Sequence, residues 1–234
     1  KIERFGYWKD TALMLEGPAV DTFIVLFLQM WTYSHELLDV TSYMVEHEGF
    51  DTPGFVVPYG DNPLDKDKVG ENVYIDILNH ARDFVHIMTP YLILDGELLH
   101  ALKFAAERGV DVSIIMPGIP DKKSVYYLAK TYYPTLLASG VKIYEYTPGF
   151  IHAKVFVSDN SRAVVGTINL DYRSLYHHFE CATYLYGTSS VLAIEEDFQA
   201  TKDQCHRVST TDVKNLPFYQ KTLGLLARLV APLM

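Results

Sequence analysis

The sequence predicts an α/β fold with a mixed, largely parallel sheet that carries helices on both faces. The first observation is an alternation of helix-like and strand-like segments from Val69 to Tyr146, because strands separated by helices are typical of such sheets. The second is the presence of helix-boundary residues: Asp95 lies where a helix needs an N-cap, and Gly109 and Gly140 lie where helices end. The third is composition, since 234 residues with 49% apolar side chains suffice for a packed core.

The individual elements follow from hydrophobic period and boundary residues. Near the N-terminus we expect a strand at 11–17 and an apolar helix from Pro18 to about Leu38, followed by a loop region at 46–72 in which 55–58 is strand-like. The remaining expected helices lie at 69–82, 95–108, 121–140, 191–207 and 219–229, and the remaining strands at 84–89, 110–116, 141–146, 151–157, 162–165 and 180–186. The last helix suits a packed position or a membrane surface, and its few cations favour packing.

Charge and cysteine content narrow the classes of function. The chain has 20 Lys and Arg against 29 Asp and Glu, a formal charge of −9, which argues against nucleic acid as the main partner. Cys181 and Cys205 have no metal-ligand spacing, so we predict reduced thiols, no metal and no other cofactor. Since no apolar run reaches the roughly 18 residues that span a bilayer and no signal peptide is visible, we expect the chain as given to be soluble or peripheral.

The most informative stretch runs from His152 to Glu180. His152, Lys154 and Asp159 have the spacing His-x-Lys-x4-Asp, and Gly166-Thr167-Ile168-Asn169 follows. If His152 and Lys154 lie in one strand, they project from the same face. A strand that ends in glycine beside a helix start also offers backbone N–H groups to an anion. A histidine alone would suit a structural position in the core, but this combination predicts phosphate chemistry.

Two short segments of the chain are similar to each other. When residues 10–17 are aligned with residues 180–187, at an offset of 170 positions, acid matches acid, alanine matches alanine, leucine matches leucine and glycine matches glycine. An internal repeat of this kind predicts that residues 1–45 are the tail of one repeat and residues 46–234 a second repeat. The partner motif of His152 is then expected about 18 residues upstream of the first residue, in a longer protein.

The motif resembles that of the phospholipase D superfamily, whose hallmark is His-x-Lys-x4-Asp followed by Gly-(Ser/Thr/Gly)-x-Asn. More narrowly, the chain is similar to the C-terminal part of bacterial cardiolipin synthases. That similarity lies in four stretches spread over nearly the whole chain: residues 7–11 with 16–20, Thr89-Pro90-Tyr91, residues 105–112 and residues 166–174. The resemblance implies a phospholipase D-like fold. The residues that it marks as catalytic are His152, Lys154, Asp159, Asn169 and Glu180, and those that it marks as substrate-binding are Gly166, Thr167 and Tyr91.

The resemblance also implies a role for each residue. In this family two motifs face each other, and one histidine attacks the phosphorus while the other protonates the leaving alcohol. It assigns the acid/base role to His152. Lys154 and Asn169 would stabilise the non-bridging oxygens without a metal, Glu180 would fix the tautomer of a catalytic histidine, and Asp159 would be structural.

Three functions are compatible with these residues. The leading one is transfer of a phosphatidyl group between two phosphatidylglycerol molecules at a membrane surface, on the cytoplasmic side of the cell membrane in the full-length protein. The second is hydrolysis by a phospholipase, or by a nuclease that works as a homodimer of single-motif chains, although the net charge and the similarity of residues 10–17 to 180–187 argue against it. The third is a half enzyme that is inactive unless a missing N-terminal repeat or a second copy completes it.

Overall fold

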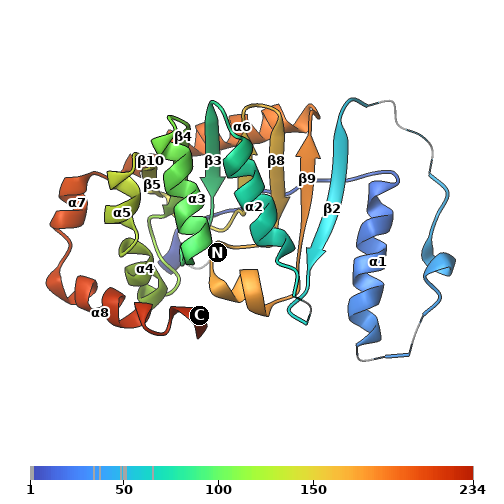
Figure 1. Ribbon diagram of the computed structural model, residues 1–234, viewed down its shortest axis with the longest axis horizontal. Coiled ribbons are helices and arrows are strands. Elements are labelled where there is room, and N and C mark those ends of the chain that lie inside the picture. The colour runs from blue at the N-terminus through green and yellow to red at the C-terminus, as the bar shows by residue number, and fades with distance from the viewer. Residues whose placement is uncertain are drawn as a thin grey trace.

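The computed structural model describes residues 3–33, 35–36, 38–47, 49, 52–64 and 66–233. A large sheet lies at the centre with helices in front of it and behind it, and α1 stands beside the sheet at its β2 edge (Figure 1). The predicted α/β class is confirmed.

Among the described residues the main sheet has eight strands in the order β10–β5–β4–β3–β7–β8–β9–β2. Their bounds are Phe55–Asp61 (β2), Phe84–Met88 (β3), Asp111–Pro117 (β4), Lys142–Tyr146 (β5), Val155–Ser158 (β7), Arg162–Gly166 (β8), Glu180–Tyr186 (β9) and Cys205–Arg207 (β10). Strands β3, β4 and β5 are parallel, whereas the other neighbouring pairs are antiparallel. The sheet is therefore mixed, as predicted, but the expectation of a largely parallel sheet was wrong. Helical crossovers join only β3 to β4 and β4 to β5 as neighbours, while β7 and β8 form a hairpin.

Helices cover both faces of the sheet, as predicted. Their bounds are Ala19–Thr32 (α1), Val69–His80 (α2), Gly96–Glu107 (α3), Lys123–Lys130 (α4), Tyr133–Ala138 (α5), Ser190–Lys202 (α6), Thr210–Lys214 (α7) and Phe218–Arg228 (α8). Helices α2 to α5 bury apolar side chains in the larger hydrophobic cluster, and α6 does so in the cluster on the opposite face through Val191, Ile194 and Phe198. In the described part of the chain, no helix is long and apolar enough to cross a membrane.

Local signals placed several helix ends correctly. The Asp95 carboxylate accepts a hydrogen bond from the Leu98 N–H at 2.8 Å, as the predicted N-cap of α3. Gly109 and Gly140 have φ values of 96° and 95°, which suits glycine after a helix. The stretch at 121–140 was expected to be one helix with a kink at Pro134; it is divided into α4 and α5, because Pro134 occupies the first turn of a new helix.

Other boundaries differ from the sequence expectation. The described residues 10–16 form no strand, and the strand lies earlier, at Tyr7–Lys9 (β1). It pairs in parallel with Gly149–Ile151 (β6). The single strand expected at 151–157 is interrupted, since β6 ends at Ile151 and β7 begins at Val155. Helix α1 ends at Thr32, before the expected limit near Leu38, and residues 34 and 37 of that stretch lie outside the described residues.

The end of the chain also differs. The helix expected at 191–207 ends at Lys202 and is followed by β10, and α7 was not predicted. The last helix was expected at 219–229 and is present as α8.

Candidate active site

The pairing of β1 with β6 positions His152. Beyond the end of β6, the His152 N–H donates to the carbonyl oxygen of Lys9 at 2.7 Å, so that residues 7–10 run beside the motif. Lys9 is tied to α6 by an ion pair, with its Nζ 2.8 Å from Asp197 Oδ2. These contacts bring Asp10 to His152, with 2.9 Å between Asp10 Oδ2 and the imidazole Nδ1.

The two ring nitrogens of His152 have different partners. Nδ1 faces the Asp10 carboxylate, and Nε2 lies 2.9 Å from Lys154 Nζ. Because a carboxylate only accepts hydrogen bonds and an ammonium only donates them, these contacts suit the tautomer in which Nδ1 donates to Asp10 and Nε2 accepts from Lys154. The Trp8 ring lies nearby at an angle of 44° to the imidazole, with the two ring centroids 5.2 Å apart. Nε2 is thus the atom of His152 that can exchange a proton with a substrate.

The buried ammonium of Lys154 lies near acidic side chains from two parts of the chain. Its side chain is buried, and its ammonium also donates to the His152 carbonyl oxygen at 2.6 Å. Burial lowers the pKa of this ammonium from its ordinary value, and the carboxylates of Asp10, Glu180 and Asp171 act in the opposite direction. Lys154 is therefore influenced both by Asp10, which contacts His152, and by Asp171 and Glu180, which follow Gly166 in the sequence.

Glu180 is bonded to Thr167 and not to His152. The Thr167 hydroxyl donates to the Glu180 carboxylate and accepts from the Cys181 N–H at 3.0 Å. Burial raises the pKa of Glu180, whereas hydrogen bonds from Thr167 and Ser174 lower it. The histidine that Glu180 would orient is therefore not His152, whose Nδ1 contacts Asp10.

Asn169 presents an amide to the same area. Its Nδ2 donates to Ser174 Oγ at 3.0 Å, and its Oδ1 is buried without a hydrogen-bond partner among the described residues. A half-turn of the amide exchanges these atoms, so that the Ser174 hydroxyl donates to Oδ1 and the NH₂ group is left to donate. Either orientation leaves one polar atom of Asn169 for a ligand, and the second orientation suits an anion.

Two hollows meet at Glu180. One of about 500 Å³ is lined by Asn169, Glu180, Tyr91 and the cationic residues Lys122 and Arg173. In it the Tyr91 hydroxyl donates to Asp121 Oδ2 at 2.6 Å.

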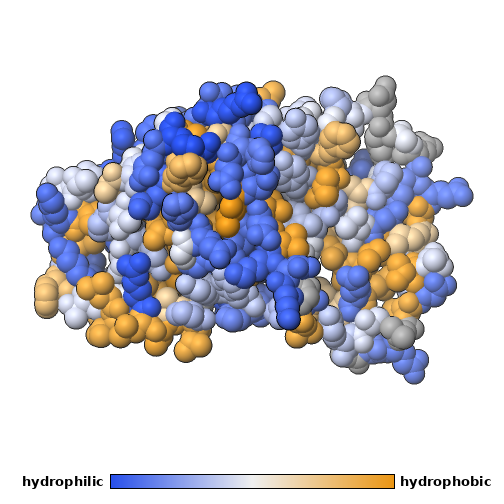
Figure 2. All heavy atoms as spheres, in the orientation of Figure 1, coloured by the Kyte–Doolittle hydropathy of each residue, from blue (hydrophilic) through white to orange (hydrophobic). Residues whose placement is uncertain are grey.

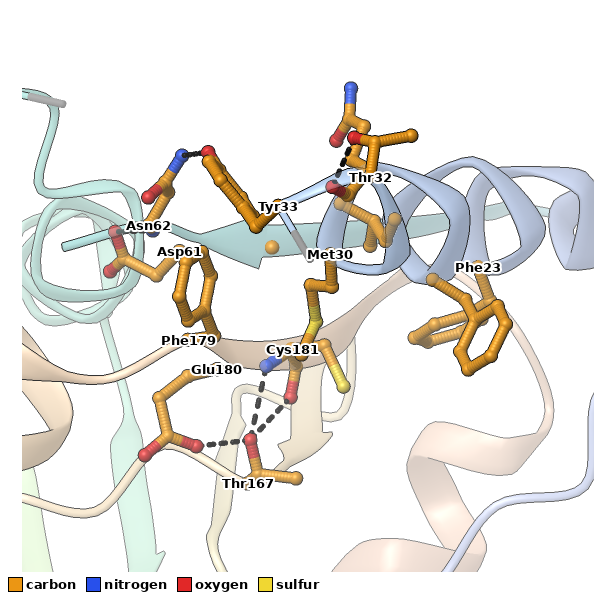
Figure 3. Close-up of a pocket in the computed structure, with 14 residues that line it drawn as sticks. Phe23, Met30, Thr32, Tyr33, Asp61, Asn62, Thr167, Phe179, Glu180 and Cys181 are labelled. Carbon is orange, nitrogen blue, oxygen red and sulfur yellow. Dashed lines mark hydrogen bonds between the residues drawn. The ribbon is translucent and has the colours of Figure 1, made fainter. Parts of the chain in front are cut away.

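The other hollow measures about 760 Å³ and lies between α1 and the β2 edge of the sheet. Thr167 and Glu180 lie at one end of it, Phe23, Met30 and Phe179 give it apolar walls, and Asp61 and Asn62 add polar groups on the β2 side (Figure 3). Polar groups beside the motif and apolar walls would suit an amphipathic ligand.

Asp159 lies in the turn between β7 and β8 and serves the backbone. It has a φ of 51°, and its carboxylate accepts from the N–H groups of Arg82 at 2.9 Å, Asp83 at 3.0 Å and Phe84 at 2.9 Å. These contacts tie the β7–β8 hairpin to the start of β3. These contacts agree with the structural role expected for Asp159, and its place among the catalytic residues stays a prediction.

Sequence reasoning missed Asp10 as a site residue. The contact joins two positions 142 residues apart, and no local pattern encodes such a pair. The available signal was the similarity of residues 10–17 to residues 180–187, in which Asp10 aligns with Glu180. Within the described residues, no group of His, Cys, Asp and Glu is arranged to hold a metal ion.

The Gly166→Ala variant is expected to lose about 1–3 kcal/mol of unfolding free energy, because overpacking displaces neighbouring atoms. A Cβ at this position would lie 2.3 Å from Ala182 Cβ and 2.5 Å from the Cys181 carbonyl oxygen. Urea unfolding followed by circular dichroism measures the change. The control is Gly96→Ala in the first turn of α3, where a Cβ has no neighbour within 4 Å. If both variants were as stable as the parent chain, the close contact of β8 with β9 would be disproved.

The fold and the site define a member of the phospholipase D superfamily of phosphodiesterases and transferases. A family model described as "Cardiolipin synthase, PLD-like domain" matches residues 74–202, more than half of the chain. The chain belongs to this family.

Known proteins agree with this assignment. The chain is 61% identical over its full length to an uncharacterized protein of Streptococcus mutans serotype c, of which it covers 51%. It is 35% identical over 98% of its length to a cardiolipin synthase of Alkalihalophilus pseudofirmus, of which it covers 46%. Nuc, a phospholipase D family member from Salmonella typhimurium, has the same fold, with a TM-score of 0.58 and 18% identity over 68% of this chain and all of Nuc. The chain thus spans about half the length of the curated relatives it matches.

Proposed function

We propose that the chain supplies one half of the active site of a phosphatidyltransferase that converts two phosphatidylglycerol molecules to cardiolipin and glycerol. The observation that carries the proposal is the geometry of His152, which is held in one tautomer by Asp10 with Nε2 beside the buried ammonium of Lys154. A proton-exchanging nitrogen next to a buried cation is what the breaking of a phosphodiester requires. Relatives named cardiolipin synthase that match 98–100% of this chain support the choice of substrate.

The reaction then has two steps. In the first, a histidine from a second motif attacks the phosphorus, an N–P bond forms, and the P–O bond to glycerol breaks. His152, which carries on Nε2 the proton that it took in the second step of the preceding turnover, donates this proton to the departing glycerol oxygen. In the second, His152 takes the proton of a hydroxyl group on another phosphatidylglycerol, whose oxygen attacks phosphorus and releases the first histidine. Lys154 and Asn169 donate hydrogen bonds to the non-bridging oxygens in both steps.

The second motif belongs to another repeat. Asp10 aligns with Glu180 in the internal repeat, and Asp10 orients His152. By the same logic Glu180 orients the histidine of the missing motif, so each repeat supplies the carboxylate for the other repeat's histidine. Residues 1–45 would then complete one repeat and residues 46–234 form the next, and the 234-residue chain by itself would be inactive unless a second copy supplies the other motif.

A lipid substrate is favoured over nucleic acid by the surroundings of the site. The hollow of about 760 Å³ that includes Thr167 and Glu180 has apolar walls from Phe23, Phe27 and Met30, besides polar groups such as Asp61, and the chain has a formal charge of −9. Apolar walls accommodate an acyl chain, whereas a negative surface repels a polyphosphate backbone.

The experiment is to supply the full-length gene product with phosphatidylglycerol and to identify the products by mass spectrometry. Cardiolipin and free glycerol in equal amounts are expected. Phosphatidic acid with glycerol would instead indicate that water is the acceptor, and the protein would then be a phospholipase. If phosphatidylglycerol were unchanged while DNA was cleaved, the proposal would be wrong and the nuclease alternative correct.

A further inference from the structure

The C-terminal helix α8 packs through one side only. Gly224 is the contact point with α4, since a Cβ there would lie 2.4 Å from the Tyr127 carbonyl oxygen and 2.8 Å from Thr131 Cγ2. Gly224 is also the one residue of α8 that is buried. The expectation that the last helix is a packed one therefore holds for one side of α8 and leaves the opposite side to be explained.

That opposite side is exposed and apolar. The exposed fraction is 83% for Phe218, 80% for Leu229 and 85% for Leu233. Further exposed apolar side chains of the same segment are Tyr219, Leu223, Leu225, Leu226 and Val230. Figure 2 shows hydrophobic residues gathered at the lower left of the molecule, where Figure 1 draws α8. Residues 218–233 are called the α8 surface below, and a concentration of apolar side chains of this size is typical of an interaction site.

The charges around the α8 surface are positive although the whole chain is negative. Residues 213–234 contain no Asp or Glu, and neither do residues 122–144, which include the α4 helix that packs on α8. The cations of these two segments are Lys122, Lys123, Lys130, Lys142, Lys214, Lys221 and Arg228. Lys130 and Lys142 are paired with Glu145 and Asp111, and the others give the surface a positive rim within a chain of charge −9.

The α8 surface ends at the candidate active site. Leu233 lines the hollow of about 500 Å³ together with Asn169 and Glu180. His177 Nε2 is 3.1 Å from the Pro232 carbonyl oxygen, which fixes the end of the chain beside the motif. Lys122 and Arg173 line the same hollow. Anything that binds to the α8 surface therefore lies next to the hollow of the candidate active site.

We infer that the α8 surface docks on the surface of an anionic phospholipid bilayer, with α8 lying in the plane of the membrane. Apolar side chains enter the acyl boundary and the cationic rim meets the phosphate groups, which is the arrangement of an amphipathic interfacial helix. The inference rests on the proposed function in one respect only, that a lipid substrate would enter from the layer that α8 contacts.

A second copy of the chain is the less favourable occupant. In a twofold symmetric dimer the same surface meets itself. Such contact would bring together two copies of a segment that carries cations and no acidic residue, and like charges at an interface are unfavourable. Anionic lipid neutralises these side chains instead.

The test is sedimentation of the 234-residue chain with vesicles of phosphatidylglycerol and phosphatidylcholine, compared with vesicles of phosphatidylcholine alone. We expect binding to the anionic vesicles that weakens as salt rises. The double variant Phe218→Ser/Leu229→Ser is expected to bind at least about tenfold more weakly, since each side chain loses its transfer to the apolar layer. The matched control is Phe104→Ser/Leu192→Ser, which alters equally apolar side chains of α3 and α6 that are 47% and 51% exposed.

Circular dichroism and light scattering complete the experiment. Thermal unfolding must be the same for both double variants, so that weaker binding reflects the surface and not the fold. Failure of the parent chain to bind anionic vesicles would overturn the inference, as would equal binding by both double variants. A dimer that depends on Phe218 and Leu229, without vesicle binding, would assign the surface to a second copy. Vesicle binding does not require turnover, so the inference and the proposed function can fail separately.

Discussion

The His152→Ala variant of the full-length protein is expected to transfer phosphatidyl groups about 10²- to 10⁴-fold more slowly than the parent, the usual contribution of a positioned acid or base. In the proposed mechanism His152 exchanges its proton through Nε2, because Asp10 contacts the other ring nitrogen. The release of glycerol from phosphatidylglycerol under initial-rate conditions measures the loss. The matched control is His80→Ala, because His80 also contacts a carboxylate, Asp76, at 3.0 Å but is an exposed residue of α2.

A change of leaving group separates the two roles that a histidine can have here. If His152 donates a proton to the leaving oxygen, its loss matters much less, about tenfold or less, for an ester of 4-nitrophenol, whose anion leaves without a proton. A rate loss of the same size on both substrates would instead identify His152 as the nucleophile. Equal rates for His152→Ala and His80→Ala would exclude His152 from the chemistry altogether.

The parts of the fold that sequence predicted are those with local causes. The Asp95 cap and the glycines at 109 and 140 act within a few residues, and each ended or began a helix as expected. The direction of the strands was not predicted well, because it depends on which strands become neighbours. The pairing of β1 with β6 joins Tyr7 to Gly149, and no periodicity within either segment encodes that register.

In the candidate site, too, features with local causes were predicted and features that depend on tertiary structure were not. The residue types at His152 and Lys154 were recognised from their spacing, and the structure joins them by a contact of 2.9 Å. Their expected position within one strand was wrong, since β6 ends before His152 and β7 begins after Lys154. Because residues 152–154 lie outside both strands, the Lys154 ammonium reaches both the imidazole ring and the carbonyl oxygen of His152. The Asp10 contact needed the tertiary structure, since it depends on β1 lying beside β6.

The Asp159→Ala variant is expected to lose about 2–4 kcal/mol of unfolding free energy, because three backbone N–H groups lose a charged acceptor. These groups belong to Arg82, Asp83 and Phe84, at the start of β3. About 1–2 kcal/mol of the loss comes from placing alanine at a φ of 51°. Asp159→Gly removes that strain while it also lacks the acceptor, so its loss relative to the parent chain isolates the hydrogen bonds, and the difference between the two variants measures the strain. Urea unfolding measures both, with the exposed Asp203→Ala as the control.

Activity per folded molecule then separates structure from chemistry at Asp159. Asparagine tolerates the left-handed backbone and keeps one oxygen that accepts hydrogen bonds. We therefore expect Asp159→Asn in the full-length protein to keep its turnover within about tenfold of the parent, well above the loss expected from removing an acid or base. A loss as large as that of His152→Ala, in a variant that is fully folded, would place Asp159 among the catalytic residues. Unchanged stability of Asp159→Gly would show instead that the carboxylate does not hold the hairpin to β3.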